Sequence, residues 1–101
     1  MTILSKKQQS LHPYGKVTTL QRIAVRATKK ADWIEWEAPH APDHSLTASD
    51  REVIAKHRAR ALAATIELAH VVVDNPDLDW TLPQRRAAER AVAASEGQYV
   101  R

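Results

Sequence analysis

The chain has 101 residues, of which 44% are hydrophobic and 27% charged, and its formal net charge at pH 7 is +3. These values are typical of one globular domain and exclude a wholly disordered chain. The absence of cysteine excludes a disulfide scaffold, a thiolate metal site and a cysteine nucleophile. With only 2 glycines, the chain also lacks a glycine-rich phosphate loop.

The sequence predicts no contact with a membrane. No apolar stretch approaches the roughly 20 residues that a spanning helix needs. The segment 1–10 is not followed by the apolar core of a secretory signal. We therefore expect a protein of the cytoplasm, in keeping with its lack of cysteine.

Charge is distributed unevenly along the chain. Residues 1–31 hold seven basic and no acidic side chains, whereas residues 32–101 hold all 12 acids. Such an asymmetry indicates an anionic partner, of which nucleic acid is the commonest, although a solvated basic terminus has the same composition. The residues expected to contact nucleic acid or another anion are Lys6, Lys7, Lys16, Arg22, Arg26, Lys29, Lys30, Arg85, Arg86 and Arg90.

Residues 1–16 show no helical period, and the run His12–Gly15 contains the Pro and Gly of a turn. We therefore predict an irregular basic arm over residues 1–16 that becomes ordered on a partner.

The next apolar residues follow helical spacing and predict a helix over residues 18–37. Thr18 or Thr19 is its expected N-cap, and Pro39 its stop. The alternative is a strand over residues 17–25, where Thr and Val cluster. The apolar stripe comprises Leu20, Ile23, Ala24, Ala27, Ala31 and Ile34.

A second helix is predicted over residues 48–74, after a proline-containing loop. Thr47 and Asp50 have the spacing of a capping box. A heptad-like seam follows, formed by Ala55, Ala59, Leu62, Ile66, Ala69 and Val73. Its apolar arc is too wide for one companion helix, so two helices or another chain should flank it. The seam predicted to face an oligomer or a partner consists of Leu62, Ile66 and Val73.

A third helix is predicted over residues 82–95, with Thr81 as N-cap, Gln84 in the capping-box position and Gly97 as stop. Residues 98–101 form a tail. The expected fold is therefore all-α: a three-helix bundle, or a long helical hairpin plus a third helix, in a single domain over residues 17–97. The expected core is rich in alanine, and an alanine side chain buries little apolar area. We therefore expect a second copy or a partner protein to cover the remaining apolar surface of the helices.

Trp33 and Trp36 fall on the side of the first long helix that faces away from its apolar stripe. With Ile34 beside them, they are the predicted anchors for a protein partner, because Trp is enriched at interface hot spots. Alternatives are closure of the core by one Trp, or stacking on a base. The interleaved acids Asp32, Glu35 and Glu37 should repel phosphate and suit a basic protein surface. Trp80 is expected to staple the turn between the second and third helices.

No catalytic arrangement is recognisable, so we expect no enzyme, no cofactor and no metal. His40 and His44 have i, i+4 spacing but lie in a proline loop without a third ligand. Asp74, Asp77 and Asp79 lack the glycine and the bidentate glutamate of a calcium loop. His57 is expected to pack, and His70 to pair with Glu67 on the polar face.

Three functions fit these observations. The first is a small non-enzymatic helical protein-binding module: an adaptor, an inhibitor or a subunit of a larger assembly, including the class of mobile-element factors that block host machinery. The second is a nucleic-acid-binding accessory protein that uses the basic N-terminal third. The third is an anionic small-ligand binder at an oligomer interface, with Tyr14 in the clamp. A homo-oligomer is compatible with each of them.

Overall fold

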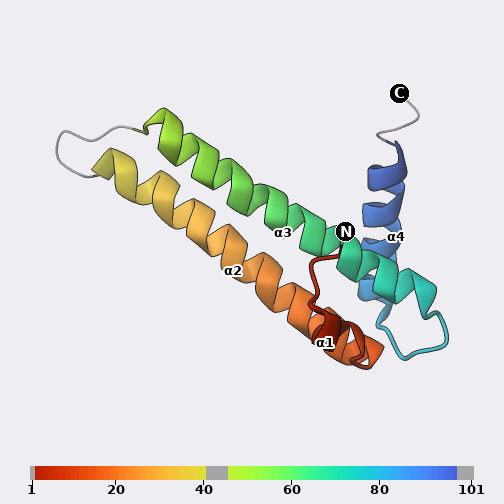
Figure 1. Cartoon of the computed structure of the whole chain (residues 1–101). Coiled ribbons are helices and arrows are strands. Elements are labelled where there is room, and N and C mark those ends of the chain that lie inside the picture. The colour runs from red at the N-terminus through yellow and green to blue at the C-terminus, as the bar shows by residue number, and fades with distance from the viewer. Residues whose placement is uncertain (1, 41–45, 98–101) are drawn as a thin grey trace.

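The computed structural model describes residues 2–40 and 46–97, which contain four helices and no strand. These are α1 (Lys6–Gln9), α2 (Pro13–His40), α3 (Ala48–Asp74) and α4 (Leu82–Gly97). The helices α2 and α3 form a long hairpin, and α4 packs against α3 (Figure 1). The predicted all-α class is confirmed, in its form of a long hairpin plus a third helix. The strand alternative for residues 17–25 is wrong, because α2 covers them.

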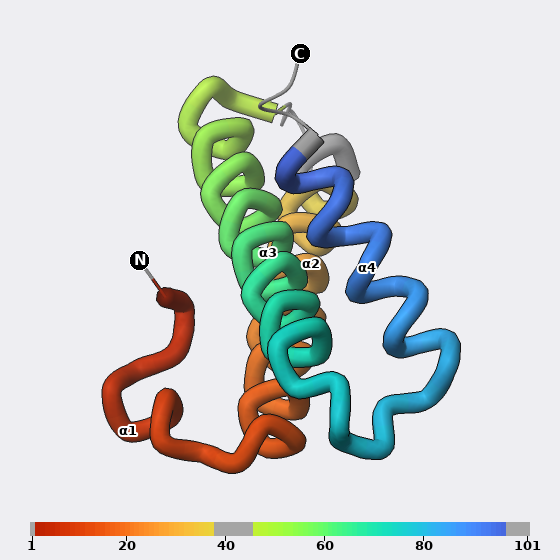
Figure 2. Tube along the Cα trace, turned by 90° about the vertical axis from the view of Figure 1, so that its right-hand side faces the viewer, coloured from red at the N-terminus to blue at the C-terminus, as the bar shows by residue number. Residues whose placement is uncertain are grey.

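The hairpin is covered at only one of its ends. The N-terminal arm and α4 pack at the end where α2 begins, whereas, of the residues that the structure describes, only those of α2 and α3 lie at the far end (Figure 1). The arm and α4 lie on opposite sides of the α2–α3 pair (Figure 2). The Cα radius of gyration is 16.2 Å, above the roughly 13 Å of a compact domain of this length. Across the described residues, no helix combines the length and the apolarity that crossing a membrane requires.

Two clusters of buried residues form the core at the covered end. One gathers Val17, Ala69, Val72, Trp80 and Ala88, and so joins α2, α3 and α4. The other joins Leu4 of the arm to Leu20 and Ala64. The predicted apolar stripe of α2 is confirmed, since its residues Leu20, Ala27 and Ala31 are all buried.

Both ends of α2 differ from the prediction, since the helix continues through Pro39 to His40 and Pro39 is not its stop. The helix begins at Pro13 and not at Thr18, so the run His12–Gly15 is no free turn. Pro at the first helical position needs no hydrogen-bond partner for its nitrogen and is already set to the helical φ. His12 precedes Pro13 and accepts two hydrogen bonds from the first turn of the helix. Its Nδ1 accepts the Tyr14 N–H (3.2 Å), and its carbonyl accepts the Lys16 N–H (3.0 Å). Thr18 therefore lies inside the helix, where its hydroxyl donates to the Tyr14 carbonyl.

The predicted irregular arm is also wrong, because the described part of residues 1–16 is ordered against α3. Ser5 and Gln8 form a capping box around α1. Leu4 is only 5% exposed. The Glu67 carboxylate accepts a hydrogen bond from the Thr2 hydroxyl and one from the Ile3 N–H, the latter at 2.7 Å. The Ser-x-x-Gln spacing was the available sequence signal for this turn.

The other caps and the Trp80 staple follow the sequence. Capping boxes form at Thr47 with Asp50 and at Thr81 with Gln84. Trp80 is 6% exposed, and its Nε1 donates to the Asn75 carbonyl at 2.9 Å.

Tyr14 ties the first turn of α2 to this staple. Its ring meets that of Trp80 edge to face with centroids 4.9 Å apart, and its hydroxyl accepts the Asp79 N–H at 2.8 Å. Tyr14 thus has a structural role, which its predicted place in an anion clamp did not include.

Replacing Trp80 by alanine should destabilise the protein by about 3–5 kcal/mol, because a buried Trp leaves a cavity at the junction of three helices. Urea denaturation followed by circular dichroism measures this loss. The matched control is Trp33→Ala, which removes an exposed Trp. It should lower the free energy of unfolding by less than about 1.5 kcal/mol, which is the most that an aromatic pair contributes. Equal losses in the two variants would show that Trp80 does not anchor the fold.

Replacing Glu67 by alanine should release the arm while leaving the hairpin folded. The Ile3 amide then loses its acceptor, so its hydrogen exchange should accelerate by about ten-fold, the equivalent of one hydrogen bond. Exchange measured by NMR separates this local opening from global unfolding, since amides in the middle of α3 should keep their rates. An unchanged Ile3 rate would mean that burial of Leu4 alone holds the arm.

Candidate functional site

The exposed tryptophan pair lies on α2 in its two-helix half. Trp33 and Trp36 are three residues apart, which places them on one helix face. Their rings stack with centroids 5.4 Å apart and an interplanar angle of 30°. They are 57% and 55% exposed, so the predicted position away from the core is confirmed and neither ring closes the core. Ile34 next to them is half-buried.

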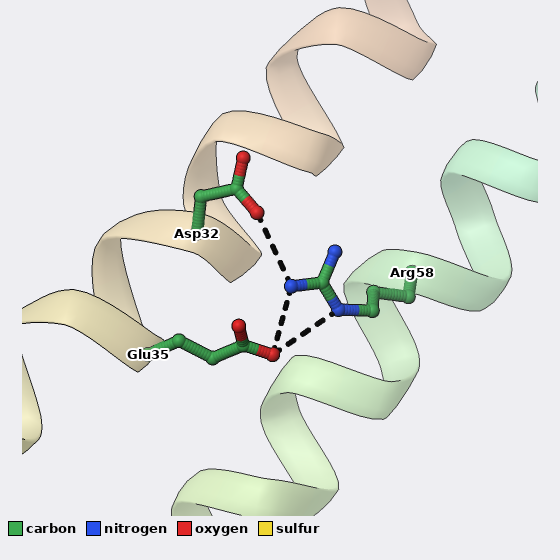
Figure 3. Close-up of polar contacts among 3 residues, drawn as sticks. All are labelled: Asp32, Glu35 and Arg58. Carbon is green, nitrogen blue, oxygen red and sulfur yellow. Dashed lines mark hydrogen bonds and ion pairs between the residues drawn. The ribbon is translucent and has the colours of Figure 1, made fainter.

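Two of the acids beside the tryptophans, Asp32 and Glu35, are paired across the hairpin. Arg58 of α3 reaches across the hairpin, and its Nη2 lies 3.1 Å from Asp32 Oδ1 and 2.8 Å from Glu35 Oε1 (Figure 3). Its Nε also donates to Glu35 Oε1 at 3.3 Å. The hydrogen bonds to Glu35 and then to Asp32 raise the pKa of Arg58, which therefore stays charged at any pH of interest. Two of the three acids are thus neutralised, which weakens the expected repulsion of phosphate from the tryptophans.

A row of cations continues the tryptophan face toward the start of α2. Positions 22, 26, 29, 33 and 36 alternate spacings of four and three, so Arg22, Arg26 and Lys29 share a face with the tryptophans. The three cations line an open groove of about 550 Å³ together with Val25. Three of the five predicted anion residues of α2 therefore lie on one surface that continues the face of the aromatic pair.

A second cationic surface forms between α2 and α3. Arg26 and Lys30 of α2 and His57 and Arg60 of α3 line a cavity of about 230 Å³. Sequence analysis missed His57 and Arg60 as members of this group, because only the register of the hairpin brings them opposite Arg26 and Lys30. Like charges at i, i+4, such as Arg26 and Lys30, disfavour the helix by about 0.2–0.5 kcal/mol.

The other predicted cations do not join these two surfaces. Lys6, Lys7, Arg86 and Arg90 are exposed and line neither cavity, and Lys16 is half-buried near the start of α2. Arg85 does not fit an anion-binding role at all. Its guanidinium donates to the carbonyls of Pro76, Leu78 and Trp80, and so closes the turn between α3 and α4.

The predicted seam of α3 is partly uncovered. Both α2 and α4 contact α3, so its wide apolar arc is flanked by two helices of the same chain, as one of the two expected arrangements requires. Leu62 and Val73 nevertheless remain exposed, and Ile66 is half-buried beside a groove that also contains Thr2 and His70. The seam is thus available to a second copy or to another protein.

The predicted histidine pair lies outside the described residues. The structure describes neither the side chain of His40 nor residues 41–45, which include His44. Among the side chains that are described, no three of His, Cys, Asp and Glu come together as metal ligands.

Comparison with protein-family models, with curated proteins and with solved structures gave no match. The function is therefore inferred from the surfaces of this chain itself.

Replacing Arg85 by alanine should lower the free energy of unfolding by about 1.5–3 kcal/mol, because charge-assisted hydrogen bonds to three carbonyls are lost. Thermal and urea unfolding measure this change. Arg86→Ala removes the same charge from the neighbouring, exposed position, and its effect should stay within about 0.5 kcal/mol. If the two variants are equally stable, Arg85 has no structural role.

Proposed function

We propose that this protein is a small non-enzymatic helical module that binds a protein partner through Trp33 and Trp36, with Ile34 beside them. The observation that carries the proposal is the exposure of two stacked tryptophans on one helix face. An adaptor, an inhibitor or a subunit of an assembly would use such a surface, and factors that mobile elements direct against host machinery belong to this class.

The physical chemistry of the pair supports a protein partner. Trp provides a large, rigid contact area with few rotatable bonds, and interface hot spots are enriched in it for this reason. The two rings already stack on one another, so docking would cost little side-chain entropy. Arg58 bridges this part of α2 to α3, since it pairs with Asp32 and Glu35 beside the tryptophans.

The test is a comparison of partner recovery by the wild-type chain and by the double variant Trp33→Ala/Trp36→Ala. Quantitative mass spectrometry of crosslinked complexes identifies partners, and titration of the purified partner then gives affinities. The double variant should bind at least about 30-fold more weakly, because a single hot-spot residue contributes 2 kcal/mol or more. Circular dichroism should show that it remains folded.

Leu82→Ala is the matched control, since Leu82 is 57% exposed but lies at the start of α4. It should leave the affinity unchanged. Unaltered binding by the tryptophan double variant would refute the proposal. If sedimentation shows self-association that Leu62→Ala abolishes and the double variant does not, the principal partner is a second copy bound through the α3 seam.

Nucleic-acid binding is the second candidate, favoured by the cations that share the face of the tryptophans. Arg22, Arg26 and Lys29 could follow a phosphate backbone while bases stack on the aromatic pair. Fluorescence anisotropy of labelled oligonucleotides at increasing salt separates the two functions, because phosphate contacts weaken steeply with salt. Absence of binding at low salt would eliminate this candidate.

A further inference from the structure

We propose that the cavity between α2 and α3, lined by Arg26, Lys30, His57 and Arg60, binds a phosphate group. The site shares Arg26 with the cationic face beside the tryptophans. It contains neither Trp33 nor Trp36, so the proposal does not depend on the protein-binding function. No single stretch of the sequence contains it, because two of its residues come from each helix.

The cavity has the size and lining of a site for one anionic group. Its volume of about 230 Å³ is below the 300–1,000 Å³ of pockets that enclose a drug-sized ligand. Ile23 and Ala27 complete its lining. Ile23 also packs against the cluster that Leu4 of the arm forms with Leu20 and Ala64, so one wall of the cavity adjoins the core.

The charges of the hairpin are sorted between its two sides. Helical geometry places Asp32 and Glu35 on one flank of α2, where Arg58 neutralises them, and Arg26 and Lys30 on the opposite flank. Within the described part of the chain, Arg26, Lys30 and Arg60 form no ion pair. Three permanent cations therefore converge without a counter-charge, and a bound anion would relieve their mutual repulsion.

Phosphate fits this donor set better than a carboxylate does. Arg26 and Arg60 approach from different helices, and a guanidinium can donate two parallel hydrogen bonds to a phosphate. Lys30 adds a point charge and His57 an imidazole donor. A tetrahedral anion offers acceptor oxygens in several directions to such converging donors, whereas a carboxylate offers two in one plane. The phosphate could belong to a small phosphorylated molecule or to a nucleic-acid backbone.

Calorimetric titration of the full chain at low salt tests the site with three probes: inorganic phosphate, pyrophosphate and a short single-stranded oligonucleotide. The variant Arg26→Gln/Lys30→Gln/Arg60→Gln should weaken binding by about ten-fold or more, because charge-assisted hydrogen bonds are lost. The charge-matched control Lys7→Gln/Arg86→Gln/Arg90→Gln lowers the net charge equally but leaves the cavity intact. It should retain the affinity within about two-fold, since exposed charges distant from the ligand are largely screened.

The pattern of binding identifies the source of the phosphate. Binding of pyrophosphate that depends on the cavity residues indicates a small ligand, and cavity-dependent binding of the oligonucleotide alone indicates a backbone. In either case, the amides of Ile23 and Ala27 should shift in NMR spectra when the ligand is added. The proposal is overturned if no probe binds, or if the two triple variants weaken binding equally, which would reflect only the positive field of the whole protein.

Discussion

Burial of Trp80 is the constraint on which the rest of the structure depends. The ring joins the last turns of α3 to α4 and receives the edge-to-face contact of Tyr14 from the first turn of α2. The first turn of α2, which is distant in the sequence, therefore meets the turn between α3 and α4 at one side chain. Arg85 closes the same turn by donating to three carbonyls, so the direction in which α4 leaves the hairpin is set there.

Because this anchor lies at one end, the two ends of the hairpin have different roles. At the covered end, the large apolar side chains of Leu20 and Trp80 are buried in the core. At the two-helix end, Ala31 and Ile54 are buried and Arg58 bridges the two helices at the surface, whereas Trp33 and Trp36 remain exposed. Buried and exposed large apolar side chains are thereby separated along the molecule, so the exposed ones lie apart from the two core clusters.

The sequence predicted the features that depend on local spacing. The helix over residues 48–74, both threonine capping boxes, the apolar stripe of α2 and the outward tryptophans all follow from periodicity within a single segment. The misplaced features depend on contacts between segments. Pro13 begins a helix whose first turn is held by Trp80, and the arm is ordered because Glu67 and Leu4 fix it to the hairpin.

The candidate site divides in the same way. Exposure of Trp33 and Trp36 could be read from one helix, but the pairing of Asp32 and Glu35 with Arg58 and the convergence of Arg26 with Arg60 required the register between α2 and α3. A pattern within one segment contains no information on which charges of another helix will lie opposite. Spacing alone likewise does not show that the Arg85 guanidinium donates to carbonyls of the preceding turn and not to an anion.

The small side chains between the long helices have one more consequence. Ala27, Ala31 and Ala64 are at most 4% exposed, so methyl groups act as the spacer between α2 and α3. The spacer sets how far each charged side chain must reach across the hairpin. The bridge from Arg58 on one flank and the cavity of cations on the other therefore share one interhelical distance. A bulkier residue at Ala31 would widen both at once, because overpacking a close helix contact shifts the backbones apart.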